Sequence, residues 1–213
     1  MSYDRHVGVF SPEGRIYQTE YALKSVQLSL TSLCVTSKGQ TILAAETISQ
    51  PLAAAKSPFA KISDSIYAVS SGYSSDISLV YTQLRSISLN HKFNFGSEIS
   101  LQQLANQIAN FMSNFGRSSS KKAAMGRPFG CAILLCQKGR CFCVDAAGNA
   151  QEWLGKAIGA GAASGQEEIE RLFGNSEFGV EMVKGVMGEV VEGGYSVAVL
   201  GQDGFKVVFE KGL

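Results

Sequence analysis

The chain has 213 residues, of which 45% are hydrophobic and 17% are charged, and its formal net charge is +1. A chain of this length can bury one substantial hydrophobic core, and no linker-like segment predicts a second domain. The near-neutral charge argues against nucleic acid or an anionic membrane surface as a partner. No apolar run approaches the length of a membrane span.

The five cysteines form an odd set, and each lies inside an apolar run: Cys34, Cys131, Cys136, Cys141 and Cys143. Such a set is typical of free thiols in a reducing compartment. The N-terminus has no basic segment followed by an apolar one, so no secretory signal is expected. We therefore expect an intracellular, soluble protein.

The first thirty residues predict a short arm, a tight turn and a helix. Ser11 is a candidate N-cap, Pro12 has a φ suited to a helix start, and Gly14 would allow close approach to a neighbour. From residue 16 the apolar residues have helical spacing in two stripes. One stripe holds Tyr17, Tyr21 and Leu28, and the other holds Ile16, Leu23, Val26 and Leu30. A second stripe at a chain terminus favours contact with another subunit; the alternative is an internal core helix.

The rest of the chain predicts two blocks of strands, each followed by two helices, and a final strand pair. The first block is a hairpin over 32–37 and 41–46, then a strand pair at 61–62 and 66–71. Apolar spacing predicts helices over 77–87 and 101–115, the second with a Ser100/Gln103 capping box. The basic stretch 117–125 is either an anion site or, more simply, a solvated loop.

The second block repeats this order. A hairpin over 131–136 and 141–144 leads to a strand near Trp153. Helices are expected over 164–173, with a Ser164/Glu167 capping box, and over 180–190, before strands 195–200 and 205–209. Grouped strands and grouped helices favour a pair of antiparallel sheets with helices outside, rather than alternating βαβ units.

The N-terminal stretch resembles the signature of the alpha-type subunits of the 20S proteasome. The matching residues are Tyr3-Asp4-Arg5, then Phe10-Ser11-Pro12-Glu13-Gly14-Arg15, then the helix Gln18-Thr19-Glu20-Tyr21-Ala22. Three later motifs are also similar: Ser71-Gly72 with Asp76, Arg127-Pro128-Phe129-Gly130, and Asp145-Ala146-Ala147-Gly148, where proline is usual at the second position. The pairs Arg5-His6 and Tyr17-Gln18 resemble most closely the family member that occupies the first of the seven alpha positions.

The resemblance implies an α+β fold, the N-terminal-nucleophile hydrolase αββα sandwich, in which two antiparallel sheets lie between helix layers. It implies a single domain over 1–213, with a gate segment (1–12), an N-terminal helix region (13–30) and the sandwich (31–213). The implied function is that of a non-catalytic alpha-ring subunit, which forms the substrate gate and the activator-docking surface for ubiquitin- and ATP-dependent protein degradation in the cytoplasm and nucleus. No cofactor and no metal are implied.

The implied partners are the other alpha subunits of a heptameric ring, the beta-ring subunits, and the activators or regulatory particle. Residues with implied roles fall into three sets. The gate cluster is Tyr3, Asp4, Arg5, Pro12 and Tyr21; the activator-tail pocket is Lys61 and Gly72; the ring contact is Ile16, Tyr17, Tyr21 and Val26. Lys61 would bind the C-terminal carboxylate of an activator tail, a task that suits a flexible point charge.

The alternative function is that of a catalytic, beta-type threonine peptidase. Such relatives use a mature N-terminal threonine with an acid and a lysine beside it. In this chain Leu30 falls near the nucleophile position, and Glu46 and Lys61 fall near the acid and the lysine. Thr31 would act only after a cleavage that removes the helix before it, so we expect no catalytic residue.

The alternative interpretation of the later cysteines is a metal site. In alternating strands Cys141 and Cys143 share one face, but Cys131 and Cys136 face opposite ways. Buried structural thiols are therefore the favoured interpretation.

Overall fold

The computed structural model describes residues 8–48, 52, 57–115, 126–173 and 179–212. Its first half, in chain order, consists of α1 (Tyr17–Gln27), β1 (Ser32–Ser37), β2 (Gln40–Thr47), β3 (Ala60–Lys61), β4 (Tyr67–Gly72), α2 (Ser74–Phe95) and α3 (Leu101–Met112). The second half consists of β5 (Cys131–Gln137), β6 (Arg140–Val144), β7 (Ala150–Trp153), β8 (Gly155–Ile158), α4 (Ala162–Phe173), α5 (Val180–Val190), β9 (Gly194–Gly201) and β10 (Gly204–Lys211).

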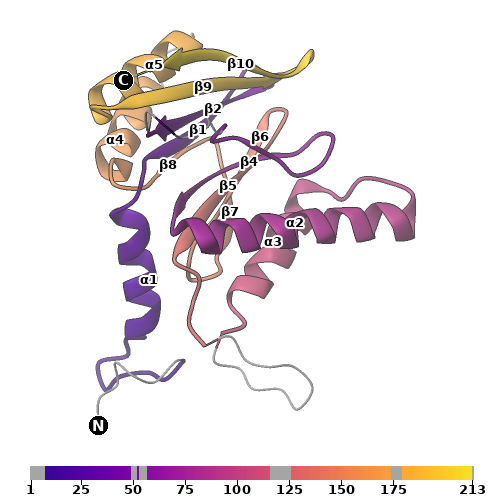
Figure 1. Ribbon diagram of the computed structural model, residues 1–213, viewed down its shortest axis with the longest axis vertical. Helices are drawn as coiled ribbons and strands as arrows, with labels where there is room; N and C mark the ends of the chain where they lie inside the picture. The colour runs from indigo at the N-terminus through magenta and orange to yellow at the C-terminus, as the bar shows by residue number, and fades with distance from the viewer. Residues whose placement is uncertain (1–7, 49–51, 53–56, 116–125, 174–178, 213) are drawn as a thin grey trace.

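Within the described residues, the strands form two five-stranded sheets in which every neighbouring pair is antiparallel. One sheet has the order β10-β9-β2-β1-β8 and the other the order β3-β4-β5-β6-β7. Helices α4 and α5 lie outside the first sheet, and α2 and α3 lie against the second (Figure 1). The predicted αββα sandwich of two antiparallel sheets between helix layers is therefore confirmed.

Strand alternation divides the hydrophobic residues among three layers of core. In β1, Leu33 and Val35 point to the core under α4 and α5, whereas Cys34 points to the core between the sheets. In β5, Ile133 points to the core under α2 and α3, and Leu134 points between the sheets. Because both faces of these strands are covered, their sequences read as continuous apolar runs.

Most predicted elements agree with the structure to within two residues. The exceptions are α2, predicted over 77–87 and observed at Ser74–Phe95, α3, which ends three residues earlier than predicted, and the start of the first helix. Ser11 does not cap it, because α1 begins at Tyr17 with Ile16 at the cap position. The Ser11 hydroxyl instead accepts a hydrogen bond from the amide of Arg15 at 3.1 Å and so closes the preceding turn. Gly14 has a φ of +77° and no atom within 4 Å of a hypothetical Cβ, so the turn conformation, not close approach, requires glycine there.

Two further differences concern the second half of the chain. Helix α4 begins at Ala162, so Ser164 lies inside it and the predicted capping box with Glu167 is wrong. Only Leu154 separates β7 from β8, and at this residue the chain crosses from one sheet to the other. The sequence did not predict β8, because a single-residue connection carries no turn signal.

The cysteine prediction holds for three residues and fails for two. Cys131, Cys136 and Cys143 are free and buried. Cys34 and Cys141, 107 residues apart, form a disulfide and are not free thiols. A short turn brings neighbouring strands together predictably, but β1 and β6 belong to different sheets, and sequence periodicity does not show which strands face each other across the sandwich.

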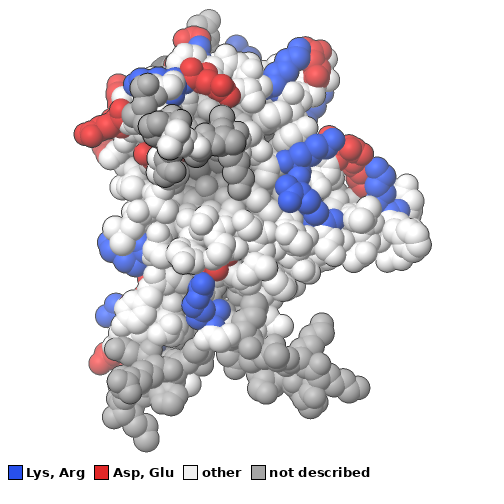
Figure 2. All heavy atoms as spheres, in the orientation of Figure 1, with Lys and Arg blue, Asp and Glu red and all other residues white. Residues whose placement is uncertain are grey.

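None of the helices within the described ranges is both long enough and apolar enough to cross a membrane. On the face drawn in Figure 2, lysine, arginine, aspartate and glutamate side chains lie in small groups of mixed sign. This distribution agrees with the near-neutral net charge.

Candidate functional site

Helix α1 presents its two apolar stripes to different surroundings. Val26 is only 7% exposed and packs with Ala22 in the core between the sheets. On the other stripe Tyr21 is 52% exposed and Leu28 is 73% exposed. The helix extends from one end of the sandwich toward the start of the chain (Figure 1). One stripe therefore attaches α1 to its own domain, and the other remains on the surface.

This division corrects one member of the predicted ring contact. Val26 cannot contact a neighbouring subunit, because its own core covers it. Tyr17 is half-buried and stacks on Tyr21, with ring centroids 6.4 Å apart, and its hydroxyl donates to Glu13 at 3.0 Å. Ile16 is half-buried just before the helix. Tyr21, with its stacked neighbour, stays the central residue of the predicted contact.

The predicted gate cluster falls largely outside the part of the chain that the structure describes. Tyr3, Asp4 and Arg5 belong to residues 1–7, which are not described. Of the other two members, Pro12 is exposed in the turn before α1 and Tyr21 is exposed on α1. The cluster therefore stays a prediction.

A buried carboxylate joins the start of α2 to the segment before β5. The Asp76 side chain is 5% exposed and accepts two hydrogen bonds from the Arg127 guanidinium, at 2.7 and 2.9 Å. The amide of Gly130 donates to the same carboxylate at 2.9 Å, and the Gly130 carbonyl accepts from Ser25 on α1 at 3.1 Å. The last turn of α1 is thus connected through Gly130 to the ion pair between Asp76 on α2 and Arg127.

The electrostatics of this junction favour the ionised form of Asp76. Burial by itself would raise the pKa of the carboxyl group, but the hydrogen bonds from Arg127 and the Gly130 amide outweigh it, so the pKa lies below its usual value. In the sequence, Asp76 and the motif at 127–130 were noted separately, each only because it resembles a family motif. An acid and an arginine 51 residues apart gave no local signal that they meet.

Gly72 lies at the same junction. Its φ is +130°, and a Cβ there would lie 2.2 Å from the carbonyl oxygen of Gly130. Both the backbone conformation and the available space therefore require glycine. This role is structural and differs from the predicted place in a pocket beside Lys61.

Lys61 lies at the other end of β4, because it pairs with Tyr67 across β3 and β4. Gly72 lies five positions after Tyr67 along β4, which corresponds to about 16 Å. The structure therefore separates Lys61 and Gly72 within one chain, and the activator-tail pocket stays a prediction, with Lys61 as the residue that would bind the carboxylate. Strand ends this far apart cannot line one site for a single carboxylate.

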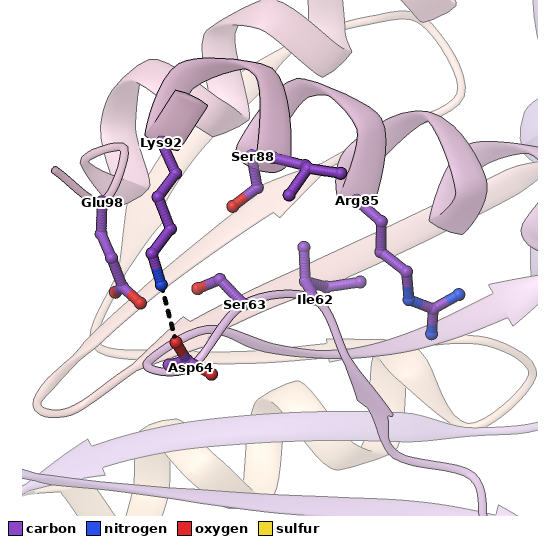
Figure 3. A pocket seen from close by; sticks show the side chains of 8 residues that line it. Ile62, Ser63, Asp64, Arg85, Ser88, Lys92 and Glu98 are labelled. Atoms are coloured by element: carbon purple, nitrogen blue, oxygen red, sulfur yellow. Dashed lines mark hydrogen bonds and ion pairs between the residues drawn. The ribbon is translucent and has the colours of Figure 1, made fainter. Parts of the chain in front are cut away.

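A cavity of about 270 Å³ lies next to Lys61, between α2 and the turn from β3 to β4 (Figure 3). Within it Lys92 reaches from α2 toward Asp64, with an Nζ–Oδ2 distance of 3.0 Å. Lys61 Nζ lies 3.2 Å from the other oxygen of Asp64. The hydrogen bonds from Lys92 and then Lys61 lower the pKa of Asp64. A carboxylate ligand of Lys61 must therefore compete with Asp64.

The residues considered for catalysis have other partners. The backbone amide of Thr31 donates to Glu46 Oε2 at 2.8 Å, and its hydroxyl accepts from the amide of Gly161 at 3.0 Å. Glu46 is on β2 of one sheet, and Lys61 is on β3 of the other. A terminal threonine would offer its free amine as a base. In this chain the corresponding nitrogen of Thr31 is a peptide nitrogen, and it is hydrogen-bonded to the Glu46 carboxylate.

Comparison with known proteins decides the family. A family model described as proteasome subunit matches residues 26–209, and one described as the A-type N-terminal signature of proteasome subunits matches residues 3–24. The chain is a proteasome subunit of the alpha type. Together the two matches cover residues 3–209 except residue 25, and so include most of α1 and most of both sheets.

Several relatives of this alpha-type chain are named as alpha type-5 subunits of the proteasome. The one from Trypanosoma brucei brucei is 33% identical over 173 residues, which are 77% of this chain and 70% of the relative. The one from Drosophila melanogaster is 31% identical over 180 residues, 80% of this chain and 74% of the relative. The one from Caenorhabditis elegans is 29% identical over 200 residues, 89% of this chain and 80% of the relative.

Proposed function

We propose that this chain is a non-catalytic subunit of the alpha ring of the 20S core particle. In this proposal α1 contacts a neighbouring alpha subunit, the other face of the ring contacts the beta subunits, and the segment before Pro12 contributes to the substrate gate. The observation that carries the ring contact is the exposed apolar stripe of α1, whose central residue, Tyr21, lies inside the matched alpha signature. An exposed apolar stripe of this kind is typical of a surface that another protein covers.

The position within the ring has two candidates. The pairs Arg5-His6 and Tyr17-Gln18 support the first alpha position, whereas the relatives described above are named alpha type-5. Neighbouring alpha subunits differ between the two positions. Cross-linking of the purified particle, followed by mass spectrometry of the peptides joined to α1, identifies the neighbours and decides between them. We further propose that the particle works in the cytoplasm and nucleus, which imaging of a tagged chain tests.

We expect the isolated chain to have no peptidase activity. The nitrogen of Thr31 is a peptide nitrogen and not a free amine, and it donates a hydrogen bond to the Glu46 carboxylate. Purified alone, the full chain should leave fluorogenic peptides uncleaved, at the same background rate as Thr31→Ala. Cleavage by the wild-type chain that Thr31→Ala abolishes would contradict the proposal and support the beta-type alternative.

We propose that Lys61 binds the C-terminal carboxylate of an activator tail. Its side chain is exposed, so Lys61→Ala should change the stability of the fold by only a few tenths of a kcal/mol. Losing one partner of a desolvated charge pair in a complex costs about 2–5 kcal/mol of binding free energy. The affinity of a single-tail peptide for this chain, measured at low ionic strength, should fall accordingly.

Lys92 provides the matched control for Lys61, because it is also exposed and forms an ion pair with the same Asp64. Lys92→Ala should lower peptide affinity much less than Lys61→Ala, because it only leaves Asp64 free to compete more strongly for Lys61. Equal affinity for Lys61→Ala and the wild-type chain would show that Lys61 is an ordinary surface lysine. A peptide with a single activator tail is used because an activator with several tails binds multivalently, which would conceal the loss of affinity at one pocket.

A further inference from the structure

Four of the five cysteines lie in one layer, the core between the two sheets. They are Cys34 on β1, Cys136 on β5, and Cys141 and Cys143 on β6. Cys131 points the other way, into the core under α2 and α3. This concentration of sulfur has no part in the ring contact or the Lys61 site.

Three of these sulfur atoms lie within reach of one another. The disulfide joins Cys34 of one sheet to Cys141 of the other. Cys136 is the cross-strand partner of Cys141, and its Sγ lies 3.7 Å from that of Cys141. The Sγ atoms of Cys34, Cys136 and Cys141 are all within 4.8 Å of one another. A free thiol therefore lies directly beside a disulfide, which is the arrangement that thiol–disulfide exchange requires.

Two side chains on the edge strands flank the cluster. Trp153 on β7 is the cross-strand partner of Cys141, and Lys156 on β8 is the cross-strand partner of Cys34. Both strands are edge strands, and both side chains are half-buried. Lys156 Nζ lies 4.3 Å from the centre of the Trp153 ring, so the two side chains meet across the edges of the two sheets, and we call this pair the rim.

We propose that Cys34, Cys136 and Cys141 form a redox modification site for small thiols and small disulfides, which reach it past the rim of Trp153 and Lys156. The site has two oxidised forms. One is the Cys34–Cys141 disulfide between the sheets, and the other is a Cys136–Cys141 disulfide within one sheet.

The two forms interconvert without an external oxidant. The thiolate of Cys136 attacks Sγ of Cys141; the Cys136–Cys141 bond forms as the Cys34–Cys141 bond breaks. The bonding electron pair goes to the sulfur of Cys34, which takes up the proton that Cys136 released. A dithiol instead reduces the site: it attacks one sulfur, forms a mixed disulfide, closes on itself as a cyclic disulfide, and leaves two protein thiols.

The two forms constrain the fold differently. The Cys34–Cys141 link closes a loop of 107 residues and ties the two sheets together, whereas Cys136 and Cys141 are only 5 residues apart. A link across a longer loop removes more conformational freedom from the unfolded chain. Burial raises the pKa of the Cys136 thiol and so keeps it protonated while the core is closed. Exchange therefore depends on opening at the rim.

Disulfide mapping of the full chain by mass spectrometry tests the three-sulfur site. After incubation with 2-hydroxyethyl disulfide, the wild-type chain should contain the Cys34–Cys141 bond. The Cys34→Ala variant should contain a Cys136–Cys141 bond instead, the two electrons passing to the reagent, which becomes two molecules of mercaptoethanol. Cys131→Ala, a free cysteine in the other core, should keep the wild-type pairing. Free Cys136 and Cys141 in the Cys34→Ala variant would overturn the proposal.

The rate of reduction by dithiothreitol tests the rim. Trp153→Ala should accelerate reduction of the disulfide at least tenfold under conditions in which the chain remains folded by circular dichroism. Leu154→Ala is the matched control, because this neighbouring side chain is exposed and lies between the two edge strands. Equal rates for both variants and the wild-type chain would show that small thiols do not reach the site past Trp153.

Discussion

Val26→Glu is expected to prevent folding, whereas Tyr21→Glu leaves the fold intact and abolishes incorporation into the ring. Both changes place a carboxylate on α1, but Val26 is 7% exposed and packs in the core between the sheets. Burying a polar group without a partner costs about 2–7 kcal/mol. This cost is comparable with the whole stability of a typical domain, about 5–15 kcal/mol.

Tyr21, in contrast to Val26, is exposed in the isolated chain, so a charge at this position is not buried by folding. A carboxylate there stays in water in the isolated chain, so circular dichroism and thermal unfolding should be close to wild type. In the ring the same carboxylate would be buried against the neighbouring subunit, and size-exclusion chromatography should show loss of high-mass particles. Gln27→Glu, an exposed position at the end of α1, is the control and should assemble. Normal assembly of Tyr21→Glu would contradict the ring contact.

Asp76→Asn should lower the free energy of unfolding by about 2–4 kcal/mol, since hydrogen bonds to charged groups each contribute about 1.5–3 kcal/mol. The substitution keeps the shape of the side chain but removes the charge that Arg127 and the Gly130 amide share. Chemical denaturation measures the loss. The control is Glu152→Gln, which removes an equally bidentate but exposed pair with Arg140 and should cost less than about 1 kcal/mol.

The same pair predicts a pH dependence with a definite sign. The pKa of Asp76 is lower in the folded chain than in the unfolded one, so the unfolded chain binds the proton more readily. The stabilisation by the Asp76–Arg127 pair is therefore fully present above the pKa of Asp76 in the unfolded chain, near 4. It is lost as the pH falls through the pKa of Asp76 in the folded chain. The difference in stability between the wild-type chain and Asp76→Asn should shrink in acid. A difference that stays constant down to low pH would contradict this account.

The order of most strands and helices could be predicted from the sequence, because turns, helix caps and apolar spacing depend on local geometry. The hairpin turn at Lys38-Gly39 joined the strands expected on either side, β1 and β2. The apolar spacing of α3 and its cap also agree, since the Gln103 amide donates to the Ser100 hydroxyl at 3.3 Å. The long alpha signature at the start of the chain then indicated the family, because few unrelated sequences share so many consecutive choices.

The sequence by itself determined which residues are apolar and at what period they recur, and so it determined the helices, the strands other than β8, the two stripes of α1 and the family. Only the tertiary structure decided which stripe is buried, because periodicity gives the angle between Val26 and Tyr21 but not the direction of the core. It also placed Lys61 on β3 beside the start of β4, away from Gly72 at the end of β4, and joined Cys34 to Cys141 across the sheets. These outcomes depend on contacts between segments far apart in the chain, and such contacts leave no local pattern in the sequence.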